Sequence, residues 1–267
     1  MFQKFRGLFK DLVEYLETAA VTNRDKKFVM NYIFLFIIAF FGSVITATIG
    51  FGSALVVLSF STLFWEYKTL VGIVTVYFFA NNIFKLFFYG KRIHWKTAGL
   101  VLLGSLPLVV LGAFLLVQIP TETLKRILGG IVLFYVINYQ FTPLKKYRPQ
   151  NFHIPLIGAV YGFFSGMIGV ADPIKAALLN QVGLVKEEFI ATMTIIAFIQ
   201  NFFKISIYSH FQLVSSRDWL VILGLIIVSL AGVYVGSRII KKIPVALFKK
   251  IVLIMLAIIG IKLLIWG

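Results

Sequence analysis

Charged side chains interrupt an otherwise apolar stretch in the second half of the chain, in the segment GVADPIKAALL at residues 169–179. The 18 residues before Asp172 and the ten after Lys175 carry no charge. A charge at the centre of a bilayer costs about 3 kcal/mol on insertion scales, so it usually faces a cavity or a partner. Asp172, followed by Pro173, could be a helix N-cap, or it could serve a ligand site together with Lys175 one turn further on.

Two amide–lysine pairs recur in matching segments, NNIFK in the first half and QNFFK in the second. In each segment an asparagine (Asn82 or Asn201) precedes a lysine (Lys85 or Lys204) by one helical turn, which places both on one face. Amides can hydrogen-bond an oxyanion, and lysine neutralises its charge. The structural alternative is that the lysines reach the membrane interface along their alkyl stems and that the amides hold helices together.

Glycine-rich breaks precede these pairs. The segment TATIGFGSAL at 46–55 interrupts a charge-free run from 28 to 65, longer than the roughly 20 residues of a straight span. Aligning the two breaks puts Asp172 opposite Ser53, the expected N-cap of a short helix. The N-terminus of a helix binds anions, and glycines let a ligand approach the backbone closely. The alternative is that these glycines are packing surfaces between helices. The predicted substrate site comprises Gly50, Gly52, Ser53, Asn82, Lys85, Gly169, Asp172, Lys175, Asn201 and Lys204.

The composition is that of a membrane protein. The chain has 267 residues, of which 60% are hydrophobic and 13% charged, with a mean hydropathy of +0.95. Its continuous apolar runs predict an all-α polytopic membrane protein of about 8–10 membrane helices or half-helices. The basic residues behind the net charge of +16 lie mostly in clusters between these runs. This placement indicates that they set the membrane topology and contact lipid headgroups, and it argues against nucleic-acid binding.

Several chemistries are excluded by residue type. The chain contains no cysteine, which rules out disulfides and thiolate metal sites. The three histidines lack partners at metal-ligand spacing, and no nucleophile–base pair is visible. We therefore predict neither a metal, a cofactor nor an enzymatic activity.

The order of segments repeats along the chain. Residues 1–28 predict an amphipathic helix on the membrane surface, 29–142 a first membrane repeat, 143–152 a polar linker and 153–267 a second repeat. If each break leaves one interrupted span, each half has four crossings and the repeats are parallel. If the second piece folds back, the parity changes. Helices are expected at 30–48, 53–65, 68–90, 97–118 and 121–142, and at 153–170, 173–185, 187–210, 217–240 and 244–266.

From residue 30 to the end, this pattern resembles the sulfite exporter TauE/SafE family, also called the toluenesulfonate uptake permease family. The resemblance rests on the twofold repeat, the glycine-rich breaks, the tryptophans Trp95 and Trp219 that open one helix in each half, and the "G…IP" signature that closes it. It implies a carrier of small anions, often sulfur oxyanions or organosulfonates, in the bacterial cytoplasmic membrane, driven by ion gradients without ATP. The chain departs from the family pattern at Ala171 and Asp172, which replace glycine.

The sequence therefore predicts a secondary transporter, an exporter or permease, of a small anion such as sulfite or an organosulfonate. Its partners would be this anion and membrane lipids, with a homo-oligomer also compatible with the sequence. Asp172 would take a proton as the anion moves. The alternative is an ion channel or cation-coupled carrier in which Asp172 and backbone carbonyls hold a cation or proton. The anion, the direction, the coupling ion and the orientation are open.

Overall fold

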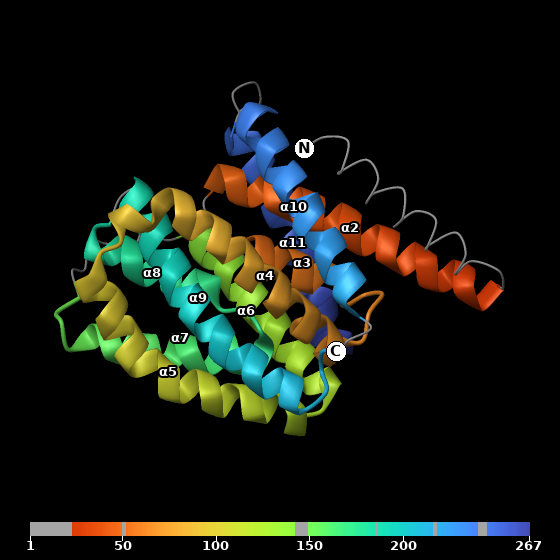
Figure 1. The fold of residues 1–267 in the computed structure, drawn as a ribbon, viewed down its shortest axis with the longest axis horizontal. Helices are drawn as coiled ribbons and strands as arrows, with labels where there is room; N and C mark the ends of the chain where they lie inside the picture. The colour runs from red at the N-terminus through yellow and green to blue at the C-terminus, as the bar shows by residue number, and fades with distance from the viewer. Residues whose placement is uncertain (1–22, 50–51, 142–148, 185, 216–217, 240–244) are drawn as a thin grey trace.

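The computed structural model describes residues 23–49, 52–141, 149–184, 186–215, 218–239 and 245–267, and every regular element in these ranges is a helix (Figure 1). The predicted all-α fold is confirmed. The elements are α2 (Asn23–Ile49), α3 (Ser53–Ser61), α4 (Tyr67–Tyr89), a 3-10 turn (Gly90–Arg92), α5 (Trp95–Gln118), α6 (Thr121–Phe141), α7 (His153–Ile168), α8 (Asp172–Val182), α9 (Lys186–His210), α10 (Trp219–Ile239) and α11 (Val245–Trp266).

Each helix expected from the sequence is present, with three notable differences at the ends. Helix α2 begins at Asn23, inside the range 1–28 predicted for a surface helix; residues 1–22 lie outside the described part of the chain. Helix α3 ends at Ser61 and not at the predicted residue 65, because the chain enters a turn there. Helix α8 ends at Val182 because Gly183, at φ 90°, takes the left-handed conformation that closes a helix.

Length and apolar surface place the chain in a membrane. Within the described ranges, the segments Tyr67–Phe87, Trp95–Gln118 and Glu187–His210 are long and apolar enough to cross a bilayer. Large apolar side chains also face outward, such as Phe87 at 87% and Leu103 at 70% exposure. Such exposure would be costly in water but is what hydrocarbon contact requires.

The two breaks are made by backbone conformation. Gly52 (φ 98°) and Gly169 (φ 84°) are left-handed, which glycine adopts without the steric cost that a side chain brings. The expectation that Ser53 is an N-cap was wrong, because Gly52 occupies that position and Ser53 is the first helical residue. Asp172 is likewise the first residue of α8 and not its cap.

Helix α3 folds back along α2. The indole N–H of Trp65 donates to the Asn31 carbonyl at 3.2 Å, and the Asn31 amide donates to the Phe64 carbonyl at 3.2 Å. Nearer the break, Gly42 lies against the Val57 side chain. The chain therefore leaves the α2–α3 hairpin on the same side as Asn31, near the start of α2.

Helix α8 returns along α7 in the same way. The Lys175 ammonium lies 5.0 Å from the centre of the Tyr161 ring, one to two turns back from the end of α7. Leu178 and Leu184 belong to the same buried cluster as Ile154, close to the start of α7. The second break is therefore also the tip of a hairpin.

The remaining helices run through the bundle. Phe79 of α4 stacks on Phe198 of α9 at 4.7 Å, and Gly72 lies beside Leu213, so α4 and α9 are antiparallel. In the same sense α6 and α11 are antiparallel, because Gly129 lies beside Gly260 while Glu122 meets Gly267.

Of the two arrangements that the sequence leaves open, the structure shows the one in which the second piece of each break folds back. In the first half, the α2–α3 hairpin returns to its own side, and α4 and α5 are long and apolar enough to cross a bilayer. With α6 as a further crossing and the same pattern in the second half, three crossings per half would give the two halves opposite orientations across a bilayer. The repeat boundaries themselves stay predictions.

Helices of one half pack on helices of the other. Helix α5 packs on α7, and reciprocally α10 packs on α2; α4 pairs with α9 and α6 with α11. One buried cluster is built mainly from α5, α7, α8 and α9, and a second mainly from α2, α3, α4, α6, α10 and α11. This reciprocal pairing is what a duplicated chain would show.

Glycines bring α5 and α7 into backbone contact. A Cβ on Gly158, Gly162 or Gly166 would lie 2.7, 2.2 or 2.2 Å from the carbonyl oxygens of Val101, Ser105 and Val109 respectively. The contacts advance together along both helices, so α5 and α7 are parallel and in close register, as small residues at four-residue spacing permit. This contact holds the end of α7 in place beside a through-running helix.

Polar side chains cap the starts of α4 and α5. The Glu66 carboxylate accepts a hydrogen bond from the Thr69 backbone N–H at 2.7 Å. Burial raises the pKa of this carboxyl, but hydrogen bonds from Thr69 and Thr121, among others, outweigh it and leave the pKa below its ordinary value. His94 caps α5, accepting from the Thr97 backbone N–H at 3.3 Å.

Candidate functional site

A cavity of about 60 Å³ lies where the two hairpin tips approach α4 and α9. All the predicted site residues that the structure describes line it, whereas Gly50 lies outside the described ranges. The sequence reasoning missed other lining residues, chiefly from the second half. The described lining comprises Gly52, Ser53, Ala54, Phe78, Asn82, Lys85, Tyr161, Ser165, Gly169, Val170, Ala171, Asp172, Lys175, Met193, Thr194, Ala197, Asn201 and Lys204.

The starts of the two short helices face this same space. Gly52 and Ser53 come from the start of α3, and Ala171 and Asp172 from the start of α8. An added Cβ on Gly52 would meet no atom within 4 Å, so the backbone there is open to a ligand. The meeting of the interrupted segments at a polar space, which the transport hypothesis requires, is present.

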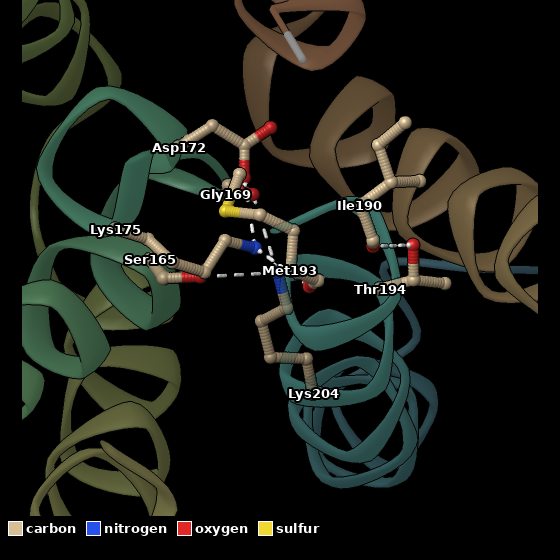
Figure 2. Close-up of polar contacts among 8 residues, drawn as sticks. All are labelled: Ser165, Gly169, Asp172, Lys175, Ile190, Met193, Thr194 and Lys204. Atoms are coloured by element: carbon tan, nitrogen blue, oxygen red, sulfur yellow. Dashed lines mark hydrogen bonds and ion pairs between the residues drawn. The ribbon is translucent and has the colours of Figure 1, made fainter. Parts of the chain in front are cut away.

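Lys175 is fully engaged with its surroundings. Its ammonium lies 3.1 Å from the Asp172 carboxylate and donates to the Met193 carbonyl at 3.3 Å (Figure 2). The same ammonium lies over the Tyr161 ring, 5.0 Å from its centre. The Lys175 side chain is 1% exposed, whereas that of Asp172 is 23% exposed. Burying an unpaired ammonium is costly, and the ion pair together with the carbonyl offsets that cost.

Lys204 is engaged with the end of α7. Its ammonium donates to the Gly169 carbonyl at 3.2 Å and to the Ser165 hydroxyl at 3.5 Å (Figure 2). Tyr208 and Tyr67 donate to the neighbouring carbonyls of Gly166 and Ile168.

A family comparison agrees with the fold and the site. Residues 35–263 match the profile of the family described as Sulfite exporter TauE/SafE. The chain belongs to the TauE/SafE family. No curated protein and no solved structure matches it. As a TauE/SafE protein, the chain is a membrane transporter of anions, which confirms the resemblance seen in the sequence.

In this TauE/SafE protein, the third cavity lysine differs from the other two. Within the described residues Lys85 makes no hydrogen bond or ion pair, although it lines the same space. The amides of Asn82 and Asn201, on residues 5% and 6% exposed, also have no hydrogen-bond partner among the described residues. These three side chains line the cavity and no described residue engages their polar groups, so they are available to a ligand.

The TauE/SafE cavity is electropositive. Three lysines and one aspartate line the described part of it, a formal charge of +2. The two hairpin tips add partial positive charge from the starts of α3 and α8. Asp172 compensates Lys175 and the Lys204 ammonium contacts the Gly169 carbonyl, which leaves the charge of Lys85 for a bound anion. The arrangement can hold an oxyanion by amide and ammonium donors.

Proposed function

We propose that this protein is a secondary transporter that binds a small oxyanion such as sulfite between the two hairpin tips. The observation that carries the proposal is the set of unpartnered donors on Lys85, Asn82 and Asn201, on α4 and α9, in one electropositive cavity. Charge-assisted hydrogen bonds from such donors are the strong ones in proteins. An oxyanion would satisfy the three side chains together.

The size of the cavity selects among anions. A water needs about 10–15 Å³ of such space, so about 60 Å³ holds roughly four waters or an anion of about four heavy atoms. A benzene ring occupies an engineered cavity of about 150 Å³. We therefore favour inorganic oxyanions over aromatic sulfonates as the ligand of this conformation.

Asp172 is the group proposed to couple transport to protons. Protonating its carboxyl would release Lys175 from the 3.1 Å ion pair and add one positive charge to the cavity. Proton and anion would then favour each other's binding, because linkage between two sites is reciprocal. Asp172→Asn keeps the size of the side chain but removes the carboxyl group. In proteoliposomes this variant should move sulfite at a rate indifferent to an imposed pH gradient, and a rate that still follows the gradient would remove Asp172 from this role.

The anion site is tested by flux. Purified full-length protein is reconstituted into sulfite-loaded liposomes whose phospholipids match those of a bacterial cytoplasmic membrane. The wild type should release the sulfite, and Lys85→Met should reduce the rate of release to that of liposomes without protein. Thr194→Val is the matched control, because Thr194 also lines the cavity but its hydroxyl already donates to the Ile190 carbonyl at 2.6 Å. Equal rates in the wild type and Lys85→Met would contradict the proposal.

A further inference from the structure

The carbonyl end of α7 is a negative pole inside the protein. The last four carbonyls of a helix lack partners within the helix, and the aligned peptide dipoles give this end about half a negative charge. In carriers with interrupted helices, such ends and the unwound carbonyls beside them commonly hold a coupled Na⁺. Helix α7 ends at Ile168, beside the cavity.

In this protein, side chains already occupy that end. The hydroxyl of Tyr208 donates to the Gly166 carbonyl at 2.6 Å, and that of Tyr67 donates to the Ile168 carbonyl at 2.7 Å. Both residues are buried, and both are neutral donors. They satisfy carbonyls but supply no charge.

The charge comes from Lys204. Its ammonium lies 3.2 Å from the Gly169 carbonyl oxygen and 3.5 Å from the Ser165 hydroxyl, and the residue is 3% exposed (Figure 2). A carbonyl oxygen and a hydroxyl oxygen at the negative end of a helix are the kind of surroundings that coordinate Na⁺ in such carriers. The ammonium group therefore stands where a soluble cation would bind.

We propose that Lys204 is a built-in cation that replaces Na⁺ at the carbonyl end of α7, so that the site beside the anion cavity is complete without a soluble cation. The proposal extends the proposed transport function, because it excludes Na⁺ as a coupling ion at this position. It also assigns different roles to the lysines at matching positions: Lys204 offsets the negative carbonyl end of α7, and Lys85 is left to bind the anion.

The test is thermal unfolding of purified full-length protein in detergent, in NaCl or in choline chloride at equal ionic strength. The wild type should unfold at the same temperature in both salts. Lys204→Ala removes the ammonium and leaves space beside the Gly169 and Ser165 oxygens. This variant should unfold at a lower temperature in choline chloride than in NaCl. Its unfolding temperature should rise with Na⁺ concentration and then saturate, because a ligand that binds the folded state stabilises that state by mass action.

Lys85→Ala is the matched control, because it removes a cavity lysine that makes no such contacts, and it should show no preference for Na⁺ over choline. A wild type that Na⁺ stabilises would overturn the proposal, as would a Lys204→Ala protein indifferent to Na⁺. If Lys204→Ala does not fold, Lys204→Arg keeps the charge and should behave like the wild type; Na⁺-dependent stability of Lys204→Arg would also overturn the proposal. These readouts do not require flux, so failure of the proposed transport would be seen separately.

Discussion

The guanidinium of Arg92 lies 3.5 Å from the carboxylate of Glu187, which joins the turn between α4 and α5 to the start of α9. Both side chains are more than half exposed, so the pair contributes little stability. The pair is informative because of where its two residues lie in the fold. If α3 continued the crossing that α2 begins, these two segments would lie on opposite faces of the membrane; the contact requires the hairpin topology.

Cysteine labelling tests this topology. Because the native chain has no cysteine, Asn151→Cys and Gly267→Cys each introduce a single thiol. The hairpin topology predicts that a membrane-impermeant maleimide labels one from outside and the other only after the membrane is opened. Labelling of both from the same side would indicate four crossings per half and would contradict the inverted arrangement.

The two matching lysines should differ in their contribution to stability. Lys204→Met removes hydrogen bonds from a charged donor and should lower the free energy of unfolding by about 1.5–3 kcal/mol for each bond lost. Lys85→Met removes no hydrogen bond and should leave the unfolding temperature unchanged or raise it. Thermal unfolding in detergent checks this, and a larger loss for Lys85→Met than for Lys204→Met would be inconsistent with the assigned roles.

The amides should contribute to anion affinity. Asn82→Leu or Asn201→Leu removes a donor to a charged ligand and should weaken sulfite binding about 10- to 100-fold, measured by the sulfite concentration that half-stabilises the protein. Thr194→Val should leave the affinity as it is. Unchanged affinity in both asparagine variants would assign the amides to helix packing instead.

Glycine packing between α5 and α7 should be sensitive to a single methyl group. Gly162→Ala places a Cβ 2.2 Å from the Ser105 carbonyl oxygen and should destabilise the protein by about 1–3 kcal/mol. Gly130→Ala is the control, because nothing lies within 4 Å of its Cβ, and alanine there should be neutral or stabilise α6 by up to about 1 kcal/mol. Similar unfolding temperatures for the two variants would argue against the close contact.

Helix positions and the clustering of Gly52, Asp172, Lys85 and Lys204 could be predicted from the sequence, because apolar length, glycine breaks and matching segments are local signals. The partners of the lysines could not. Lys175 meets Met193, and Lys204 meets Ser165, across distances in the chain that no spacing encodes. The capping role given to Ser53 failed because a left-handed Gly52 already opens the helix.

The orientation of the repeats was also beyond the sequence. A short helix that follows a glycine break has the same sequence pattern whether it continues the crossing or folds back. The contact of Trp65 with Asn31 decides the matter for the first half, because it joins the end of one hairpin arm to the beginning of the other.

The most direct measurement is a structure of the full-length protein with selenite, a heavier oxyanion of the same shape as sulfite, located by its anomalous scattering. The account predicts one selenium in the cavity, with its oxygens within hydrogen-bond distance of the Lys85 ammonium and of the Asn82 and Asn201 amides, while Lys204 keeps its contact with Gly169. Selenium found only at the membrane-facing basic clusters, with the cavity holding water alone, would contradict it.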